Sequence, residues 1–292
     1  MKMKFKKRLR LKKEVIIFNK ICICLLFILF MQHSSFLKLI IKSIGDNLEK
    51  DNYQNKYEKA IIALGAKKDK NNKKNDELFL IKEEKNEKPL IYIYNTHQTE
   101  KYLNNGKEYE PTVLHASKYL SEKFNKGGLS SIVENKSISN ILNVNGWSYG
   151  SSYKVSRLFM EEAYQNNNTI KYYFDIHRDA GSHEYTTLCI SEKCYAKILF
   201  LIGLENPNYM ENQKYAEKLS KMINDEVKGL SKGILQKKGK KVNGIYNQDF
   251  SPRAILIEIG GENNNMEEVY NTLNVLSKVL IDYIKEEIDY GN

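Results

Sequence analysis

Histidine and acidic side chains follow separated apolar runs of this sequence. His97 comes three residues after such a run, His177 directly follows a second run, and Glu258 lies near the end of a third run, ahead of two glycines. Short runs rich in β-branched and aromatic residues predict buried strands. Ligands of open α/β sheets bind beyond the carboxyl ends of the strands. The three side chains are therefore expected at one edge of one sheet.

Two imidazoles and a carboxylate form the ligand set of catalytic zinc sites, which keep one position for water. A further carboxylate outside the ligand set can accept a proton from that water. The alternative is that each histidine is an ordinary capping or loop residue, and the residue types alone leave both interpretations open. Of the other histidines, His115 and His183 are interpreted as structural or solvated, and His33 as incidental.

From residue 89 onward, apolar runs alternate with segments of helical periodicity. The runs lie at 90–94, 131–133, 170–176, 196–202 and 254–259, and the helical segments lie at 113–124, 155–164, 215–227 and 266–283. This alternation predicts an α/β domain with a mostly parallel sheet flanked by helices. Only the segment 186–189, followed by a turn up to Cys194 and by the run at 196–202, predicts an antiparallel hairpin.

The basic residues are concentrated at the start of the chain. The 292 residues include 46 Lys/Arg and 36 Asp/Glu, a formal net charge of +10. Ten of the basic residues and one acidic residue lie in the first 41 positions, so 36 basic and 35 acidic residues remain. A basic segment ahead of an apolar one predicts membrane topology and argues against nucleic acid as the partner.

We therefore expect a basic cytoplasmic tail at 1–14 and a transmembrane signal anchor at 15–41, with the rest of the chain outside the membrane. The tightest apolar stretch, 21–31, would also suit a cleaved signal peptide, but no small-residue cleavage site follows it. A buried amphipathic helix is the other alternative. Residues 42–88 are rich in Lys, Asn and Glu and predict a polar stalk.

The remaining segment, 89–292, predicts one globular domain, since 41% apolar residues suffice for a core. Four cysteines are too few for a disulfide scaffold, although Cys189 and Cys194 flank the expected hairpin tip and leave a disulfide open. The lysine-rich segment 228–241 is either an arm for anionic wall polymer or a solvated hairpin tip.

Four motifs in this order resemble the stage II sporulation protein P family. They read IYNTHQTE at 93–100, FDIHRDA at 174–180, FLIG at 200–203 with Asn206, Pro207 and Asn212, and YNQDFSPRA at 246–254 leading to Glu258 and two glycines. The resemblance covers about two thirds of the chain, from residue 89 to its end.

The resemblance implies a three-layer α/β/α fold related to that of N-acetylmuramoyl-L-alanine amidases. It implies a zinc-dependent, membrane-anchored hydrolase that cuts the N-acetylmuramoyl-L-alanine amide of peptidoglycan, and also peptide cross-bridges, during engulfment in sporulation. The implied partners are a lytic transglycosylase and a membrane-anchored sporulation protein, in the space between the mother cell and forespore membranes. A catalytically silent wall-binding scaffold that recruits a partner hydrolase is the alternative from another functional class.

Carried over by position, the family pattern makes His97 and His177 metal ligands and Glu258 the catalytic glutamate. Glu110, just before Pro111, is the expected third zinc ligand, with Glu100 as its rival and Glu108 as a weaker one.

Arg178 is expected in the catalytic site, where it would hold Asp175 or a substrate carboxylate, an ordinary salt bridge being the alternative. Asn95 and Lys101 depart from the family pattern, which puts substrate contacts in question more than metal binding.

Overall fold

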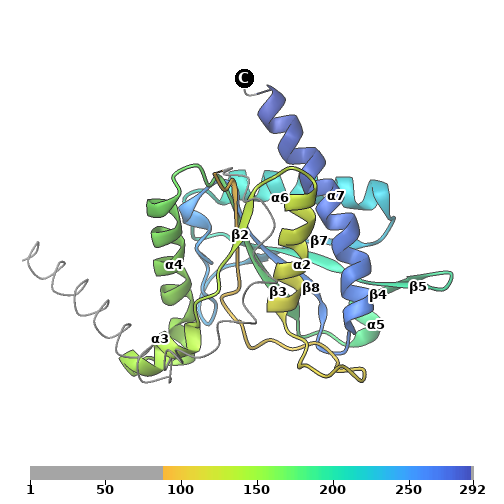
Figure 1. Cartoon of the computed structure of the whole chain (residues 1–292), viewed down its shortest axis with the longest axis horizontal. Helices are drawn as coiled ribbons and strands as arrows, with labels where there is room; N and C mark the ends of the chain where they lie inside the picture. The colour runs from red at the N-terminus through yellow and green to blue at the C-terminus, as the bar shows by residue number, and fades with distance from the viewer. Residues whose placement is uncertain (1–87, 291–292) are drawn as a thin grey trace, which may run out of the picture. The chain divides into compact units, whose positions relative to one another are not determined.

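The structure is a computed structural model that describes residues 88–290. These residues build one mixed sheet of six strands in the order β2-β1-β3-β8-β6-β7, with a separate two-stranded hairpin (Figure 1). The strands are β1 (Ile91–Tyr94), β2 (Ser131–Val133), β3 (Tyr172–Asp179), β4 (Thr187–Ile190), β5 (Lys193–Ala196), β6 (Ile198–Gly203), β7 (Ser231–Lys237) and β8 (Ala254–Gly261).

Helices connect most of these strands. They are α2 (Val113–Lys126), α3 (Ile138–Asn145), α4 (Ser152–Asn166), α5 (His183–Thr186), α6 (Tyr209–Glu226) and α7 (Met266–Tyr290), with short 3₁₀ helices η1 (Tyr149–Ser151) and η2 (Gln248–Phe250). The expected alternation of strands and helices is therefore confirmed. The helix α3 was not expected from the sequence.

The sheet is mostly parallel, as the sequence predicts. Strands β2, β1, β3 and β8 run parallel to one another, whereas β6 pairs with β8 in antiparallel fashion. The lysine-rich segment 228–241 is not a loop, because seven of its residues form β7, which pairs in parallel with β6. Its edge position explains the misreading, since an edge strand can carry polar residues and a glycine that a central strand would not.

Strand alternation sends apolar side chains to both faces of the sheet. On one face, Ile93, Phe174 and Ile257 belong to a large buried cluster with residues of α2, α6 and α7. On the other face, Tyr92 and Tyr173 pack with Met160 of α4. In Figure 1 the sheet accordingly lies between α3 and α4 on its left and α2 and α7 on its right. Helices thus cover both faces, and the carboxyl ends of β1, β3 and β8 stay at one edge.

The helix α2 shows how local chemistry fixes an element. The Thr112 side chain accepts from the backbone of the first turn, and the Thr112 amide donates to His115 Nδ1 over 3.2 Å. This reciprocal capping satisfies donors that the first helical turn leaves unpaired. His115 therefore has the structural role expected of it.

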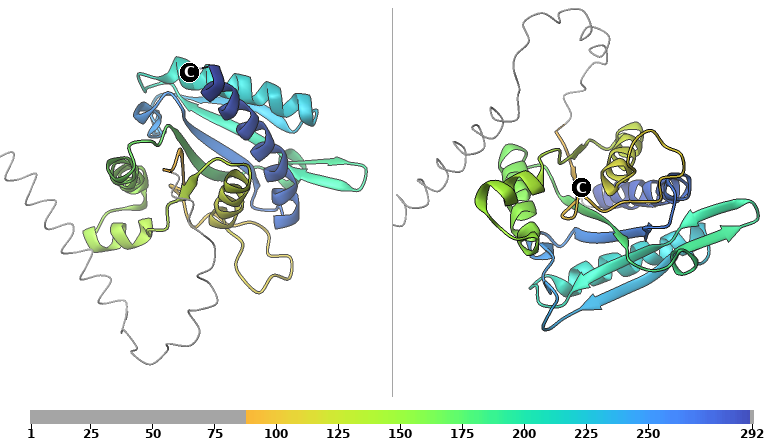
Figure 2. Two further views of the ribbon diagram at one scale, coloured as in Figure 1. Left: turned by 45° about the horizontal axis from the view of Figure 1, so that its top comes forward. Right: turned by 90° about the horizontal axis from the view of Figure 1, so that it is seen from below.

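The predicted hairpin is present as β4 and β5, which project from the domain in both views of Figure 2. Cys189 and Cys194 lie directly opposite each other and form a disulfide. The partner of β4 is β5 and not the long apolar run expected at 196–202. That run is divided at Lys197, which lies between the end of β5 and the start of β6.

The predicted tail, anchor and nearly all of the stalk lie outside the described residues. Within residues 88–290, none of the helices combines the length and apolar character needed to cross a membrane.

Candidate metal centre

His97, Glu100 and His177 converge at the carboxyl ends of β1 and β3. One potential ligand atom from each of them lies within 4.8 Å of the others. The Glu100 carboxylate bridges the pair, with Oε1 at 3.5 Å from His97 Nδ1 and Oε2 at 3.3 Å from His177 Nδ1. The two imidazole rings meet edge to face, with their centroids 5.0 Å apart.

Two short-range features bring Glu100 to the histidines. The Glu100 amide donates to the carbonyl of His97 over 3.0 Å, so the chain turns back immediately after β1. The amide of Arg178, at the end of β3, donates to Glu100 Oε2 over 3.0 Å. The turn and the strand end therefore fix the carboxylate between both imidazoles.

Asp175 supports His177 from inside the sheet. This fully buried carboxylate accepts from the amide and the hydroxyl group of Thr96 over 2.8 and 2.7 Å. Its Oδ1 lies 2.9 Å from His177 Nε2, although the pair is not aligned for a hydrogen bond. Carboxylates behind a histidine orient the ring and raise its basicity when the other nitrogen binds a metal.

The electrostatics of these groups are strongly coupled. Burial of the His177 ring disfavours its charged form, but Asp175 and Glu100 outweigh burial and raise the pKa of His177 well above its ordinary value. Burial opposes ionisation of Glu100 too, yet contacts from His177, His97 and the Arg178 amide lower its pKa to about 2. Glu100 is therefore a carboxylate at neutral pH, as a metal ligand must be.

Glu258 lies next to this cluster on the neighbouring strand. In the register of β3 and β8 it pairs with His177, so both side chains point to the same face of the sheet. Burial, together with the charges of Glu100, Asp179 and Asp175, raises the pKa of Glu258 to about 7, although His177 acts in the opposite direction. Its Oε2 is buried and has no hydrogen-bond partner.

The donor set fits a divalent metal ion. Two imidazole nitrogens and a carboxylate oxygen are typical of catalytic zinc, and an adjacent carboxylate with a free buried oxygen is suited to a proton acceptor. His97, Glu100 and His177 are thus the residues that could hold the ion, and Glu258 stands beside them.

The cluster contains Glu100 and not Glu110, the expected third ligand. Glu110 is exposed and lies 3.6 Å from Lys101, in a loop that does not bring it to the histidines. Glu108 is exposed as well, whereas the rival Glu100 belongs to the cluster. The spacing of Glu100, three residues after His97, is the sequence signal that favours it, because a tight turn brings such residues together.

A scan against protein-family models matches residues 11–281 to "Stage II sporulation protein P (SpoIIP)". The chain belongs to this family. The Stage II sporulation protein P of Bacillus subtilis (strain 168) is 35% identical over 202 residues, which are 66% of this chain and 50% of that protein. The chain therefore spans about half the length of the curated relative that it matches.

Among solved structures, the family member described here is similar to N-acetylmuramoyl-L-alanine amidases. One is AmiC2 of Nostoc punctiforme, with a TM-score of 0.40, 10% identity and coverage of 68% of this chain and 98% of that one. Another is the CwlD amidase of Clostridioides difficile, in a complex with the GerS lipoprotein, with a TM-score of 0.43, 12% identity and coverage of 69% and 99%.

Arg178 does not hold Asp175. The pairing of β3 with β8 is irregular between His177 and Asp179, and the Arg178 side chain makes other contacts. Its Nη1 donates to the carbonyl of Asp179 over 3.3 Å, and Nη2 lies 3.6 Å from Glu262. What Arg178 contributes directly to the candidate metal centre is its backbone amide.

Asn95, one of the departures from the family pattern, is a structural residue. It is buried, its side-chain amide donates to the carbonyl of Ile176 over 2.6 Å, and its oxygen accepts from Ser117 over 3.0 Å. Asn95 thus ties the end of β1 to β3 and α2. The other departure, Lys101, forms an ion pair with the exposed Glu110 over 3.6 Å.

Sequence reasoning missed the tyrosines beside His97. Tyr149 of η1 stacks on the His97 ring and Tyr153 of α4 meets that ring edge-on. Nothing in the local sequence marks these tyrosines as neighbours of a histidine some fifty residues away, since only the packing of α4 on the sheet brings them there.

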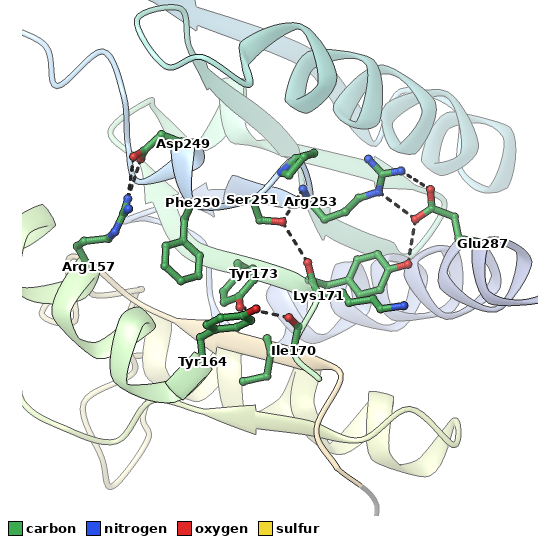
Figure 3. A pocket seen from close by; sticks show the side chains of 12 residues that line it. Arg157, Tyr164, Ile170, Lys171, Tyr173, Asp249, Phe250, Ser251, Arg253 and Glu287 are labelled. Atoms are coloured by element: carbon green, nitrogen blue, oxygen red, sulfur yellow. Dashed lines mark hydrogen bonds and ion pairs between the residues drawn. The ribbon is translucent and has the colours of Figure 1, made fainter. Parts of the chain in front are cut away.

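A groove of about 970 Å³ lies at the opposite, amino-terminal edge of β3 and β8 (Figure 3). Its middle is aromatic, with Tyr164, Tyr173 and Phe250 close together. Its arginines are paired, Arg157 with Asp249 and Arg253 with Glu287 (Figure 3). The groove is lined by none of the candidate metal ligands, so it is separate from the metal centre.

Proposed function

We propose that this protein is a zinc-dependent peptidoglycan hydrolase that cleaves the amide between N-acetylmuramic acid and L-alanine during sporulation. The observation that carries the proposal is Glu258, a carboxylate with a pKa near 7 and an unpartnered buried oxygen beside His97, Glu100 and His177. Membership of the stage II sporulation protein P family supports the sporulation context.

In the proposed reaction, zinc held by His97, Glu100 and His177 would supply the Lewis acidity that polarises the amide carbonyl and activates water. Glu258 accepts a proton from the attacking water and returns it to the alanine nitrogen as the C–N bond breaks. The acyl carbon gains the hydroxyl group and the amine leaves neutral, so atoms and charge balance. A pKa near the working pH suits a group that must both accept and donate a proton.

The remaining residues of the site hold these groups in place. Asp175 fixes the His177 ring, and the amide of Arg178 fixes the Glu100 carboxylate. Because both supports come from β3, the strand itself sets the geometry of the centre.

We further propose that the chain is anchored in the membrane by residues 15–41 and acts on the outer side, between the mother cell and forespore membranes. The distribution of charge, with nine net positive charges before residue 42, supports this orientation. A lytic transglycosylase and a membrane-anchored sporulation protein are the proposed partners, and cross-bridge cleavage is the proposed secondary activity.

His177→Ala and Glu258→Gln test the proposal in the purified full chain. We expect His177→Ala to lose bound zinc and Glu258→Gln to keep it, while both release stem peptides from sacculi at least about a hundredfold more slowly than the unmodified chain. Zinc is measured by elemental analysis and products by mass spectrometry, which also separates amidase from endopeptidase products.

His183→Ala is the matched control, because His183 contacts Glu268 outside the metal centre and is half exposed. It should keep both zinc and stem-peptide release. Unchanged zinc content and release in His177→Ala would contradict the proposed function.

A further inference from the structure

One wall of the candidate active site is an exposed tyrosine. The Tyr149 ring stacks on the His97 ring with centroids 4.9 Å apart and planes 24° apart, and 54% of Tyr149 is exposed. Its hydroxyl group also interacts with the Thr99 side chain. One face of the ring thus covers a candidate metal ligand while much of the side chain remains open to solvent.

The segment that carries Tyr149 is firmly held. Gly146 ends α3 in the left-handed conformation with φ 64°, and the Trp147 amide donates to the Leu142 carbonyl over 2.9 Å. The Ser152 hydroxyl then donates to the carbonyl of Tyr149 itself over 2.7 Å. A platform that is already ordered loses little conformational entropy when a ligand binds to it.

Further tyrosines stand behind this platform. Tyr153 meets His97 edge-on at 5.5 Å between centroids, and Tyr246 meets Tyr153 edge-on at 5.4 Å. The strained backbone of Tyr246 and Asn247, both with positive φ, is held in part by Asn247, whose amide donates to the carbonyl of Tyr153. Strain maintained beside a site is a sign that the geometry there matters.

The opposite flank has different chemistry. Lys232 of β7 donates to Asp179 over 2.7 Å and lies over the Tyr185 ring, at 3.8 Å from its centroid. In the strand order, His97 follows β1 on one side of β3 and Lys232 lies on β7 on the other side. The site therefore offers an exposed aromatic surface at the β1 side and the Lys232–Asp179 ion pair at the β7 side.

We propose that Tyr149 is the platform on which the muramoyl sugar ring of the substrate stacks, so that an amide next to a sugar is preferred over a peptide cross-bridge. This inference rests on the proposed function and names the part of the substrate that the β1 side recognises. The stem peptide, which carries charged groups, then extends toward Asp179 and Lys232.

The chemistry of the two partners supports this orientation. A pyranose ring presents a face of C–H groups with partial positive charge, and the face of an aromatic ring is negative. An uncharged sugar can therefore stack on Tyr149, whereas a peptide with carboxylates and amines gains more from charged side chains. A substrate without the sugar forfeits the stacking contact.

Binding can be measured without turnover in full-chain protein that carries Glu258→Gln. The ligands are N-acetylmuramoyl-L-alanyl-D-isoglutamine and the same dipeptide without the sugar. We expect Tyr149→Ala and Tyr149→Leu to weaken binding of the sugar-bearing ligand about tenfold, or about 1.4 kcal/mol. Tyr149→Phe should bind as before, and the sugar-free dipeptide should bind equally to all variants.

Tyr149→Leu separates recognition from support of His97, because leucine still covers the imidazole but has no aromatic face. Zinc content is measured in each variant, and retention in Tyr149→Leu shows that His97 is intact. Tyr164→Ala is the matched control, since Tyr164 is 45% exposed and lines the groove at the other edge. It should leave binding unchanged.

Unaltered binding of the sugar-bearing ligand by Tyr149→Leu would overturn the inference, as would an equal loss for the sugar-free dipeptide. Failure of the proposed function looks different, since the unmodified chain would then release no stem peptides from sacculi. The binding measurement does not depend on that release, so the two failures are distinguishable.

Discussion

At the scale of single residues, the site shows how environment divides roles between two glutamates. Glu100 is surrounded by His97, His177 and a backbone donor, and its pKa falls to about 2. Glu258 is buried without a partner for Oε2, and its pKa rises to about 7. The same side chain is thus ionised at neutral pH in one place and titrates near neutral pH in the other.

The different positions of Glu100 and Glu110 lead to a direct prediction. Glu100→Gln should lower zinc affinity by at least about tenfold, because the amide removes the anionic ligand. Glu110→Gln should leave zinc affinity unchanged, since the Glu110 carboxylate is exposed and pairs with Lys101. Competition with a chelator measures both, and equal losses in the two variants would restore Glu110 as a candidate ligand.

At the scale of elements, close approach at the end of β8 explains the two glycines after Glu258. Gly260 has φ 63°, and a Cβ atom placed on it would lie 2.7 Å from Asn264 Oδ1 and 2.8 Å from the Cβ of Ala196. Both the conformation and the space exclude a side chain here. The glycines therefore let β8 end against the segment that begins α7.

Gly260→Ala is expected to destabilise the domain by about 2–4 kcal/mol, from about 1–2 kcal/mol of left-handed strain plus the cost of overpacking. Gly229→Ala is the matched variant, because Gly229 also has positive φ but nothing within 4 Å of a new Cβ. Gly229→Ala should therefore show only the cost of the left-handed conformation. Urea unfolding measures the free energy of unfolding of both variants. The two variants should be equally destabilised if crowding around residue 260 is unimportant.

The start of β8 is tied to α7 by charge. Arg253 Nε donates to Glu287 over 2.9 Å, and the hydroxyl groups of Tyr172 and Tyr283 donate to the same carboxylate. Burial alone would raise the pKa of Glu287, but these three donors lower it. A carboxyl group with a lowered pKa in the folded state stabilises the protein at neutral pH and loses that contribution as the pH falls through the folded pKa.

Glu287→Gln should therefore lower the free energy of unfolding at pH 7 by about 0.5–1 kcal/mol, a range limited by partial solvent exposure of the pair. The difference from the unmodified chain should shrink as the pH falls from the unfolded pKa of a glutamate, about 4.3, toward the lower pKa of Glu287 in the folded state. Urea unfolding between pH 3 and pH 7 measures this trend. A difference that grows toward low pH would contradict the assigned role.

At the scale of the whole molecule, the net basic charge and the candidate metal centre lie in different parts of the sequence. The basic excess precedes residue 42, whereas the candidate metal centre lies between residues 97 and 258. Deletion of residues 1–41 should move the protein from the membrane to the soluble fraction of cells. Fractionation with immunodetection measures this, and continued membrane association of the shortened chain would contradict the proposed anchor.

The sequence alone indicated the α/β class, the central parallel strands and the positions of His97, His177 and Glu258. These depend on local patterns, since strand runs and helical spacing are set by neighbours in the chain. The same local information misread β7, because a polar edge strand lacks the apolar signature of a buried one.

Only the tertiary structure decided which glutamate joins the histidines, which way Arg178 points and which tyrosine covers His97. Each of these depends on a turn, on the end of a strand or on the packing of α4 against the sheet, and so on contacts between residues far apart in sequence. Sequence determines which chemistry is available, because residue types carry it. The fold determines which of these residues lie together in one site, because a linear sequence does not contain the distances between strands.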